Sequence, residues 1–130
     1  MKKHKCLLVG VMGAFVILAT VAVLFPVYCD YTARAALNDS LQKLIIYRDK
    51  IAMNGAERWA REGTGAEVKI SAEAFPTLNI DYARVLPDGT IIIRHAKYHQ
   101  IVVLEPSMTE GKVSWRCIGG PLRDVPTQCR

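Results

Sequence analysis

Apolar and polar positions follow three different patterns along this chain of 130 residues, and each pattern predicts a different element. The first stretch, residues 7–29, contains no charged residue. As a helix, its 23 residues would extend about 34 Å, which is enough to cross the hydrocarbon core of a bilayer. This stretch is therefore predicted to be a transmembrane helix.

The sequence "MKKHK" precedes that stretch and predicts its orientation. Basic residues stay on the cytoplasmic side, so everything after Cys29 is expected on the outer side of the membrane. A cleavable signal peptide is the alternative, because it also combines a basic start with an apolar run. No small-x-small cleavage site follows the run, however, since "LFPVYCDY" is bulky. We therefore predict two parts: a cytoplasmic start with a transmembrane helix over residues 1–29, and an outer domain over residues 30–130.

Beyond Asp30, apolar residues recur every three or four positions, which is typical of a helix with one buried face. The members of this stripe are Leu37, Leu41, Leu44, Ile45, Ile51 and Ala52. The helix is expected to reach about Met53 or Trp59, and "REGTG" at residues 61–65 to end it. Because only Pro26 interrupts the pattern, span and stripe are predicted to form one helix of about 50 residues, kinked or loosened at the proline.

Short apolar runs between turn residues then indicate antiparallel strands. Residues 67–86, which include Pro76, are expected to form an irregular polar connection, and "PDG" at residues 87–89 a turn. The strand candidates are "TIIIRH" from Thr90, "QIVVLE" from Gln100 and "KVSWRC" from Lys112. The predicted fold class is therefore α+β: one long N-terminal helix packed on a small antiparallel sheet of three to four strands.

Two strands carry further expectations about their faces. Val113, Trp115 and Cys117 share one face by the two-residue period of a strand, which leaves the opposite face of the sheet to dock on the helix. The run "TIIIRH" is apolar on both faces. It is interpreted as a central strand between the helix and the C-terminal loop, with a subunit contact surface as the alternative.

The four cysteines divide into two pairs with different expected roles. Cys117 and Cys129 bracket a short loop on the outer side of the membrane, which is oxidising in bacteria, so a disulfide contributing about 3 kcal/mol is predicted. A zinc site is not expected, because two thiols lack a clustered histidine pair and His95 and His99 lie on or beside a strand. Cys6 and Cys29 are interpreted as small apolar residues against lipid or a neighbouring helix. For Cys29, at the outer boundary, a disulfide between two copies is the alternative.

The net charge of +5 does not by itself indicate a nucleic-acid partner. Three of the charges are Lys2, Lys3 and Lys5, and from Asp30 onward 14 basic residues face 12 acidic ones, leaving +2. Residues 84–130 are more basic, with seven basic and four acidic residues. The basic residues near the loop are Arg116, Arg123 and Arg130. The alternative function is therefore a membrane-tethered binding module that contacts nucleic acid through them.

No pattern indicates an enzyme, a cofactor or a small-molecule substrate. Asp30, Asp39 and Asp49 are spread along one helix without the geometry of a paired-carboxylate site. Ser107 lacks the glycines of a nucleophile elbow, and no glycine-rich phosphate loop is present. A non-enzymatic protein is therefore expected.

Two separated segments resemble the type IV pilin family. In "PVYCDYTARAAL" the matching residues are Pro26, Tyr28, Asp30, Tyr31, Thr32, Ala33, Arg34 and Ala35. In "GKVSWRCIGGPLRDVPTQCR" they are Gly111, Trp115, Cys117, Pro126, Cys129 and Arg130. The run "VVLEP", in which Pro106 is taken to close the middle strand, is also similar to the family.

The resemblance implies a fimbrial subunit with a long helix, a small sheet and a C-terminal disulfide loop. It implies that Pro26, Tyr28, Asp30, Tyr31 and Arg34 form the segment where the helix loosens and subunits assemble. The implied partners are other pilin-type subunits, inner-membrane pilus assembly proteins and membrane lipid. The implied location is the bacterial inner membrane, with the N-terminus cytoplasmic, the C-terminal domain periplasmic and incorporation into a surface pilus.

Two departures from the family pattern change the expected role. Counted back from Pro26, the glycine that prepilin peptidase requires falls at His4, and the glutamate after the cleavage point falls at Val9. Cleavage after Gly10 or Gly13 would leave too short a span. An uncleaved minor or accessory component, serving adhesion, motility or uptake, is therefore predicted.

Overall fold

The structure, a computed structural model, describes residues 2–58 and 68–130, with side chains described for 9–53 and 68–130. The chain divides into two compact units, Met1–Thr32 and Ala33–Arg130. Each unit is described by itself below. The first consists of helix, and the second contains the sheet and the disulfide.

The N-terminal helix is long and nearly continuous. Helix α1 spans Lys2–Lys43 and α2 spans Ile45–Arg58, with Leu44 as the single turn residue between them. The Leu44 N–H donates to the Ser40 carbonyl at 3.1 Å, and the Arg48 N–H donates to the Leu44 carbonyl at 3.1 Å, so helical hydrogen bonds continue on both sides. Pro26 lies inside α1 and does not end it. The prediction of a long N-terminal helix is confirmed, with a local break at Leu44 that the sequence pattern did not indicate.

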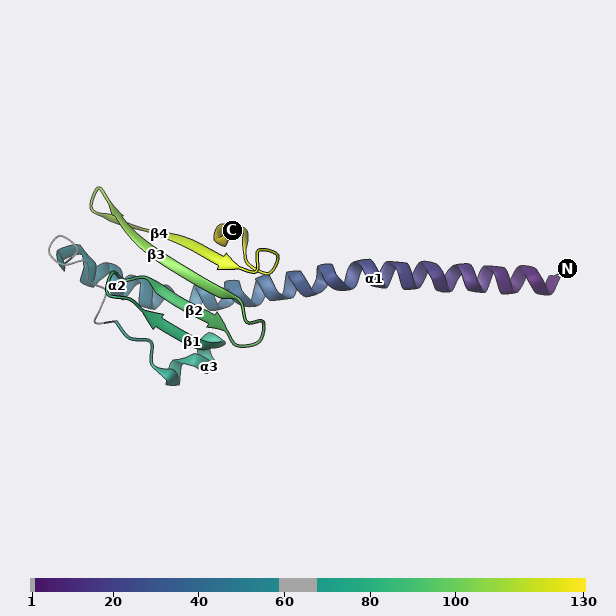
Figure 1. Cartoon of the computed structure of the whole chain (residues 1–130), viewed down its shortest axis with the longest axis horizontal. Helices are drawn as coiled ribbons and strands as arrows, with labels where there is room; N and C mark the ends of the chain where they lie inside the picture. The colour runs from purple at the N-terminus through teal and green to yellow at the C-terminus, as the bar shows by residue number, and fades with distance from the viewer. Residues whose placement is uncertain (1, 59–67) are drawn as a thin grey trace. The chain divides into compact units, whose positions relative to one another are not determined.

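The four strands form one antiparallel sheet in the order β1-β2-β3-β4 (Figure 1). They are β1 Ile80–Val85, β2 Ile91–His95, β3 Ile101–Thr109 and β4 Lys112–Gly120. Short helical turns flank the sheet: η1 Ala72–Ala74, α3 Phe75–Leu78 and η2 Thr127–Cys129. The predicted antiparallel arrangement and the inner position of "TIIIRH" in the sheet are confirmed. The expectation that this strand lies between the helix and the C-terminal loop is wrong, because Val125 and Cys129 of the loop belong to the same core as the helix residues.

Turn residues explain the connections of the meander. Gly89, at φ 88°, donates its N–H to the Leu86 carbonyl at 2.9 Å, as the "PDG" pattern predicts. Glu110 and Gly111, at φ 52° and 77°, join β3 to β4 as a two-residue hairpin. Both central residues of this hairpin turn have the positive φ that matches the twist of the flanking strands.

The expectation of an irregular connection over residues 67–86 is wrong, because α3 and β1 lie within it. The pairing of β1 with β2 shifts register between Ile80 and Tyr82, and this bulge breaks the two-residue period of apolar positions. Strand β1 lies at the sheet edge, where polar residues are tolerated, so its sequence carries little strand signal.

The expectation that Pro106 closes the middle strand is also wrong. Strand β3 continues to Thr109, and Pro106 pairs with Trp115 of β4. The last pair between β3 and β2 is Leu104 with Ile91, so Pro106 lies where β3 has a neighbour on one side only. At such an edge position a proline is tolerated without the loss of a ladder hydrogen bond.

The core lies between the helix and one face of the sheet. Its largest fully buried apolar side chains are Leu37, Leu44, Ile51, Ile91, Ile93, Val102 and Val125. Trp115 and Cys117 pack against the same core, and the Arg48 guanidinium lies 5.2 Å from the centre of the Trp115 ring. These residues do share a face, as predicted, but it is the face that docks on the helix. The expectation that the helix takes the opposite face is therefore wrong.

Candidate interaction surfaces

The first unit exposes an apolar helix surface. The large apolar side chains from Val9 to Val27 are 57–75% exposed. By length and composition α1 is able to cross a membrane, a test that a signal sequence near the N-terminus also passes. The coarse prediction of a long apolar N-terminal helix is confirmed.

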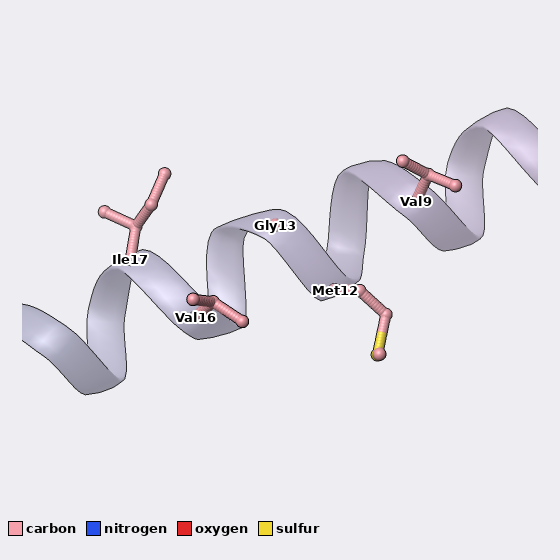
Figure 2. A pocket seen from close by; sticks show the side chains of 5 residues that line it. All are labelled: Val9, Met12, Gly13, Val16 and Ile17. Carbon is pink, nitrogen blue, oxygen red and sulfur yellow. The ribbon is translucent and has the colours of Figure 1, made fainter.

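A notch lies on this surface around Gly13. Figure 2 shows the side chains of Val9, Met12, Val16 and Ile17 projecting around the glycine, which has none. A Cβ atom added at Gly13 would meet no atom within 4 Å. Packing inside the chain therefore does not require a glycine here, although glycine in a helix interior costs about 1 kcal/mol relative to alanine.

The segment that the resemblance assigns to assembly lies within α1. Tyr28 and Tyr31 are 66% and 65% exposed, Pro26 is exposed, and Asp30 is half-buried. These four residues belong to the first unit, whereas Arg34 belongs to the second and is half-buried. Their role in assembly stays a prediction.

Cys29 lies in the same stretch and is a free, exposed cysteine. The Thr32 hydroxyl donates to its carbonyl at 2.9 Å, which is an ordinary bond along a helix. A disulfide between two copies through Cys29 also stays a prediction.

The disulfide loop folds back onto the core of the second unit. Cys117 and Cys129 are bonded, as predicted, and Cys129 and Val125 are fully buried. A Cβ atom at Gly119 would lie 3.0 Å from a Val125 methyl carbon, so the glycine lets the loop approach β4 closely. The loop is thus part of the hydrophobic core.

Gln100 connects three parts of the second unit, and the sequence analysis missed this role. It lies between β2 and β3 and is fully buried. Its side-chain N–H groups donate to the carbonyl of Ala33 in α1, at 3.0 Å, and to the carbonyl of Asp124 in the disulfide loop. Two carbonyl acceptors define which end of the amide is nitrogen. The sequence shows only a glutamine next to a predicted strand, whereas its partners are 67 and 24 residues away.

His95 is a second buried polar residue, 2% exposed at the end of β2. Its Nδ1 accepts the backbone N–H groups of Lys97 and Tyr98 at 3.2 and 3.3 Å, so the neutral ring carries its hydrogen on Nε2. Nε2 has no hydrogen-bond partner among residues 9–53 and 68–130. Burial lowers the pKa of His95 below its ordinary value; His99 and Lys97 act in the same direction and the Asp81 carboxylate opposes them.

We expect this histidine to make the folded chain less stable as the pH falls below about 6.5, the ordinary histidine pKa. The unfolded chain then binds a proton that the folded chain does not, so the free energy of unfolding decreases by up to about 1.4 kcal/mol per pH unit. Urea titrations between pH 5 and pH 8 measure the effect. His95→Gln should remove this slope, and the matched change of exposed His99 to Gln should leave it; an unchanged slope in His95→Gln would contradict the assignment.

Asp81 of β1, Arg94 of β2 and His99, which follows β2, form an exposed polar group. Arg94 Nε lies 2.7 Å from Asp81 Oδ1, and this hydrogen bond lowers the pKa of the Asp81 carboxyl and raises that of Arg94. His99 Nδ1 is 4.0 Å from Asp81 Oδ2. The group is an ion pair with an adjacent histidine, typical of a solvated surface.

The arginines considered for nucleic-acid contacts are all exposed, but on different elements. Arg116 pairs across the strands with Glu105, on the face of β4 opposite to Cys117. Arg123 lies in the turn of the disulfide loop, and Arg130 is the last residue. Arg116 thus lies on the face of β4 opposite to Cys117, and contact of the three arginines with nucleic acid stays a prediction.

Comparison of this chain with protein-family models, with curated proteins and with solved structures finds no match.

Proposed function

We propose that this chain is a type IV pilin-like subunit, and that it serves as a minor or accessory component of a pilus or a related assembly. The proposal places it in a bacterial inner membrane with its C-terminal domain in the periplasm. The observation that carries it is the exposed apolar surface of α1, 57–75% exposed from Val9 to Val27, in a helix that continues into the buried stripe of an α+β unit with a disulfide.

Such a surface needs an apolar environment, because water around it costs about 25 cal/mol for each Å² of apolar area. Lipid supplies that environment before assembly, and the helices of other subunits supply it afterwards. The Gly13 notch supports the second use, since small residues let transmembrane helices approach each other closely. The matched pilin segments at Pro26–Ala35 and Gly111–Arg130 support the family assignment.

The accessory role follows from the processing residues. His4 and Val9 occupy the positions of the family's glycine and glutamate. A glutamate in the apolar layer is costly unless it is paired, and pairing it with a neighbour's N-terminal amine would define the register between subunits. Without it, apolar packing is left to hold the subunit, so we infer occasional rather than repeated incorporation.

The test expresses the tagged full chain in a bacterium that has prepilin peptidase and type IV pili. We expect an intact N-terminus by sequencing, recovery with the inner membrane, and a small amount in sheared pili. Gly13→Leu should lower that amount about tenfold, the effect of 1.4 kcal/mol, whereas Ala22→Leu, two and a half turns further along the helix and so on its opposite side, should not. Complete cleavage after a glycine with pili built mostly of this chain would refute the accessory role, and a soluble periplasmic chain without its apolar segment would refute the whole proposal.

A further inference from the structure

The second unit has an exposed apolar face on α2. Ile45, Ile46 and Met53 are 48%, 61% and 79% exposed. Together with exposed Asp49 they follow the three- and four-residue spacing of one helix side, while Ile51 is fully buried on the other. We call these four residues the helix face: three large apolar side chains around one carboxylate.

A second exposed apolar face lies on the sheet, on the side away from the core. Tyr82, Ile101 and Ile118 are 43%, 52% and 39% exposed, and Ile92 and Val103 are half-buried. The strand register places Ile92 opposite Val103 and Val103 opposite Ile118, so the apolar residues form a row across β2, β3 and β4. We call these five residues the sheet face. A hollow of about 220 Å³ lies on it, lined in part by Tyr82, Ile92 and Ile101.

Basic residues outnumber acidic residues around the sheet face. Arg94 is paired with Asp81, and Arg116 is opposite Glu105. Arg84 pairs across the strands with Ile92, and no ion pair involves it within the described part of the chain. On the helix face, Asp49 likewise has no ion pair with any described side chain. Arg116 and Glu105, which also lie on this side of the sheet, likewise have no ion pair among the described residues, and their charges are opposite. Arg84 therefore leaves the surroundings of the sheet face net positive, whereas Asp49 is the carboxylate of the helix face.

From this complementarity we propose that the helix face of one copy docks on the sheet face of a second copy, with Asp49 against Arg84. The dimensions agree. From Ile45 to Met53 the helix rises about 12 Å, and the four strands are about 14 Å apart from first to last. The contact is heterologous, because it joins two different faces of the chain.

This contact between subunits adds detail to the proposed function. It rests on that function in one respect, because a shared membrane brings the copies together. The full chain, with Cys6 and Cys29 replaced by serine, is reconstituted in lipid vesicles as two tagged forms. One carries Ile46→Cys on the helix face, and the other Ile101→Cys on the sheet face. A short bismaleimide should join the two forms to each other, and neither form to itself.

Charge reversal then tests the pairing of Asp49 with Arg84. Asp49→Arg in the Ile46→Cys form should lower the cross-linked product about tenfold, the effect of 1.4 kcal/mol, because like charges then oppose each other. Arg84→Asp in the Ile101→Cys form should restore it. The matched reversals Glu73→Arg and Lys69→Asp, on exposed residues outside both faces, should have no effect.

Each other outcome overturns the inference. Self-linking of either form as strong as mixed linking would show a symmetric contact, and a failed restoration would show that Asp49 and Arg84 do not meet. Linking of the Ile101→Cys form in cells to a different protein, without linking between copies, would assign the sheet face to another partner. The experiment distinguishes this contact from the proposed function. Cross-links in vesicles without recovery of the chain in pili would refute only the proposed function. Recovery in pili without these cross-links would refute only the proposed contact between copies.

Discussion

Replacing Gln100 with glutamate is expected to lower the free energy of unfolding by about 3 to 5 kcal/mol at pH 7. The amide is fully buried and donates to the carbonyls of Ala33 and Asp124. A carboxylate of the same shape donates nothing, and its charge would lie against two carbonyl oxygens in a fully buried site. The disulfide loop and the helix would both lose their link to the turn between β2 and β3.

The same variant should recover stability as the pH is lowered. Burial and the two carbonyl oxygens raise the pKa of the new carboxyl in the folded chain, so the folded state binds a proton more strongly than the unfolded state does. Stability is therefore greatest below the ordinary glutamate pKa of about 4.3 and decreases as the pH rises through the folded pKa. Denaturant titrations of the full chain in detergent, referred to wild type at each pH, measure this difference.

Gln100→Leu is the control, since it also removes both donors but adds no charge. It should cost about 2 to 3 kcal/mol, because two buried carbonyls lose a partner, and its loss should not depend on pH. A Gln100→Glu chain that is as stable as wild type, or whose loss is the same at pH 4 and pH 8, would show that the amide does not connect these elements.

Removing the disulfide is expected to cost about 3 kcal/mol, the chain-entropy value for a loop of this length. The measurement compares wild type with Cys117→Ala/Cys129→Ala by denaturant titration, followed by the fluorescence of tryptophan, with Trp115 beside the bond. Dithiothreitol should produce the same loss in wild type and none in the variant. Cys29→Ser, at an exposed free cysteine, should change stability by less than about 0.5 kcal/mol.

The disulfide and Gln100 should also be coupled. The bond holds the loop that supplies the Asp124 carbonyl, so once the loop is released, loss of the amide matters less. The combined variant should therefore lose less stability than the two separate losses added together, by more than about 0.5 kcal/mol. Simple additivity would mean that the loop keeps its place without the bond.

Several expectations from the sequence hold because they depend on local chemistry. The uncharged run, the leucine stripe at Leu37, Leu41 and Leu44, and the turn at Gly89 are each encoded within a few neighbouring residues. The disulfide between Cys117 and Cys129 was also predictable, since the two cysteines bracket a short loop on the side of the membrane predicted to be oxidising. Periodicity and turn chemistry act at short range, so a single sequence displays them.

The wrong expectations concern features that depend on pairing between residues far apart in the sequence. Strand β1 exists because β2 pairs with it across a bulge, and β3 continues past Pro106 because its other side has no neighbour there. The two-residue period placed Trp115 and Cys117 on one face but contains nothing about which face meets the helix.

The long helix, three of the four strands, the disulfide and the buried residues Leu37, Leu41, Leu44 and Ile51 of the helix stripe were therefore readable from the sequence, whereas Ile45, also expected in that stripe, is 48% exposed. The edge strand, the face on which the helix docks, the bonds of Gln100 and the two exposed apolar faces became visible only in the folded chain. The physical reason is that a residue's own chemistry sets its preference for helix, strand or burial, while its partners depend on how distant segments meet. Gln100 and Ala33, 67 residues apart, have no local pattern that connects them.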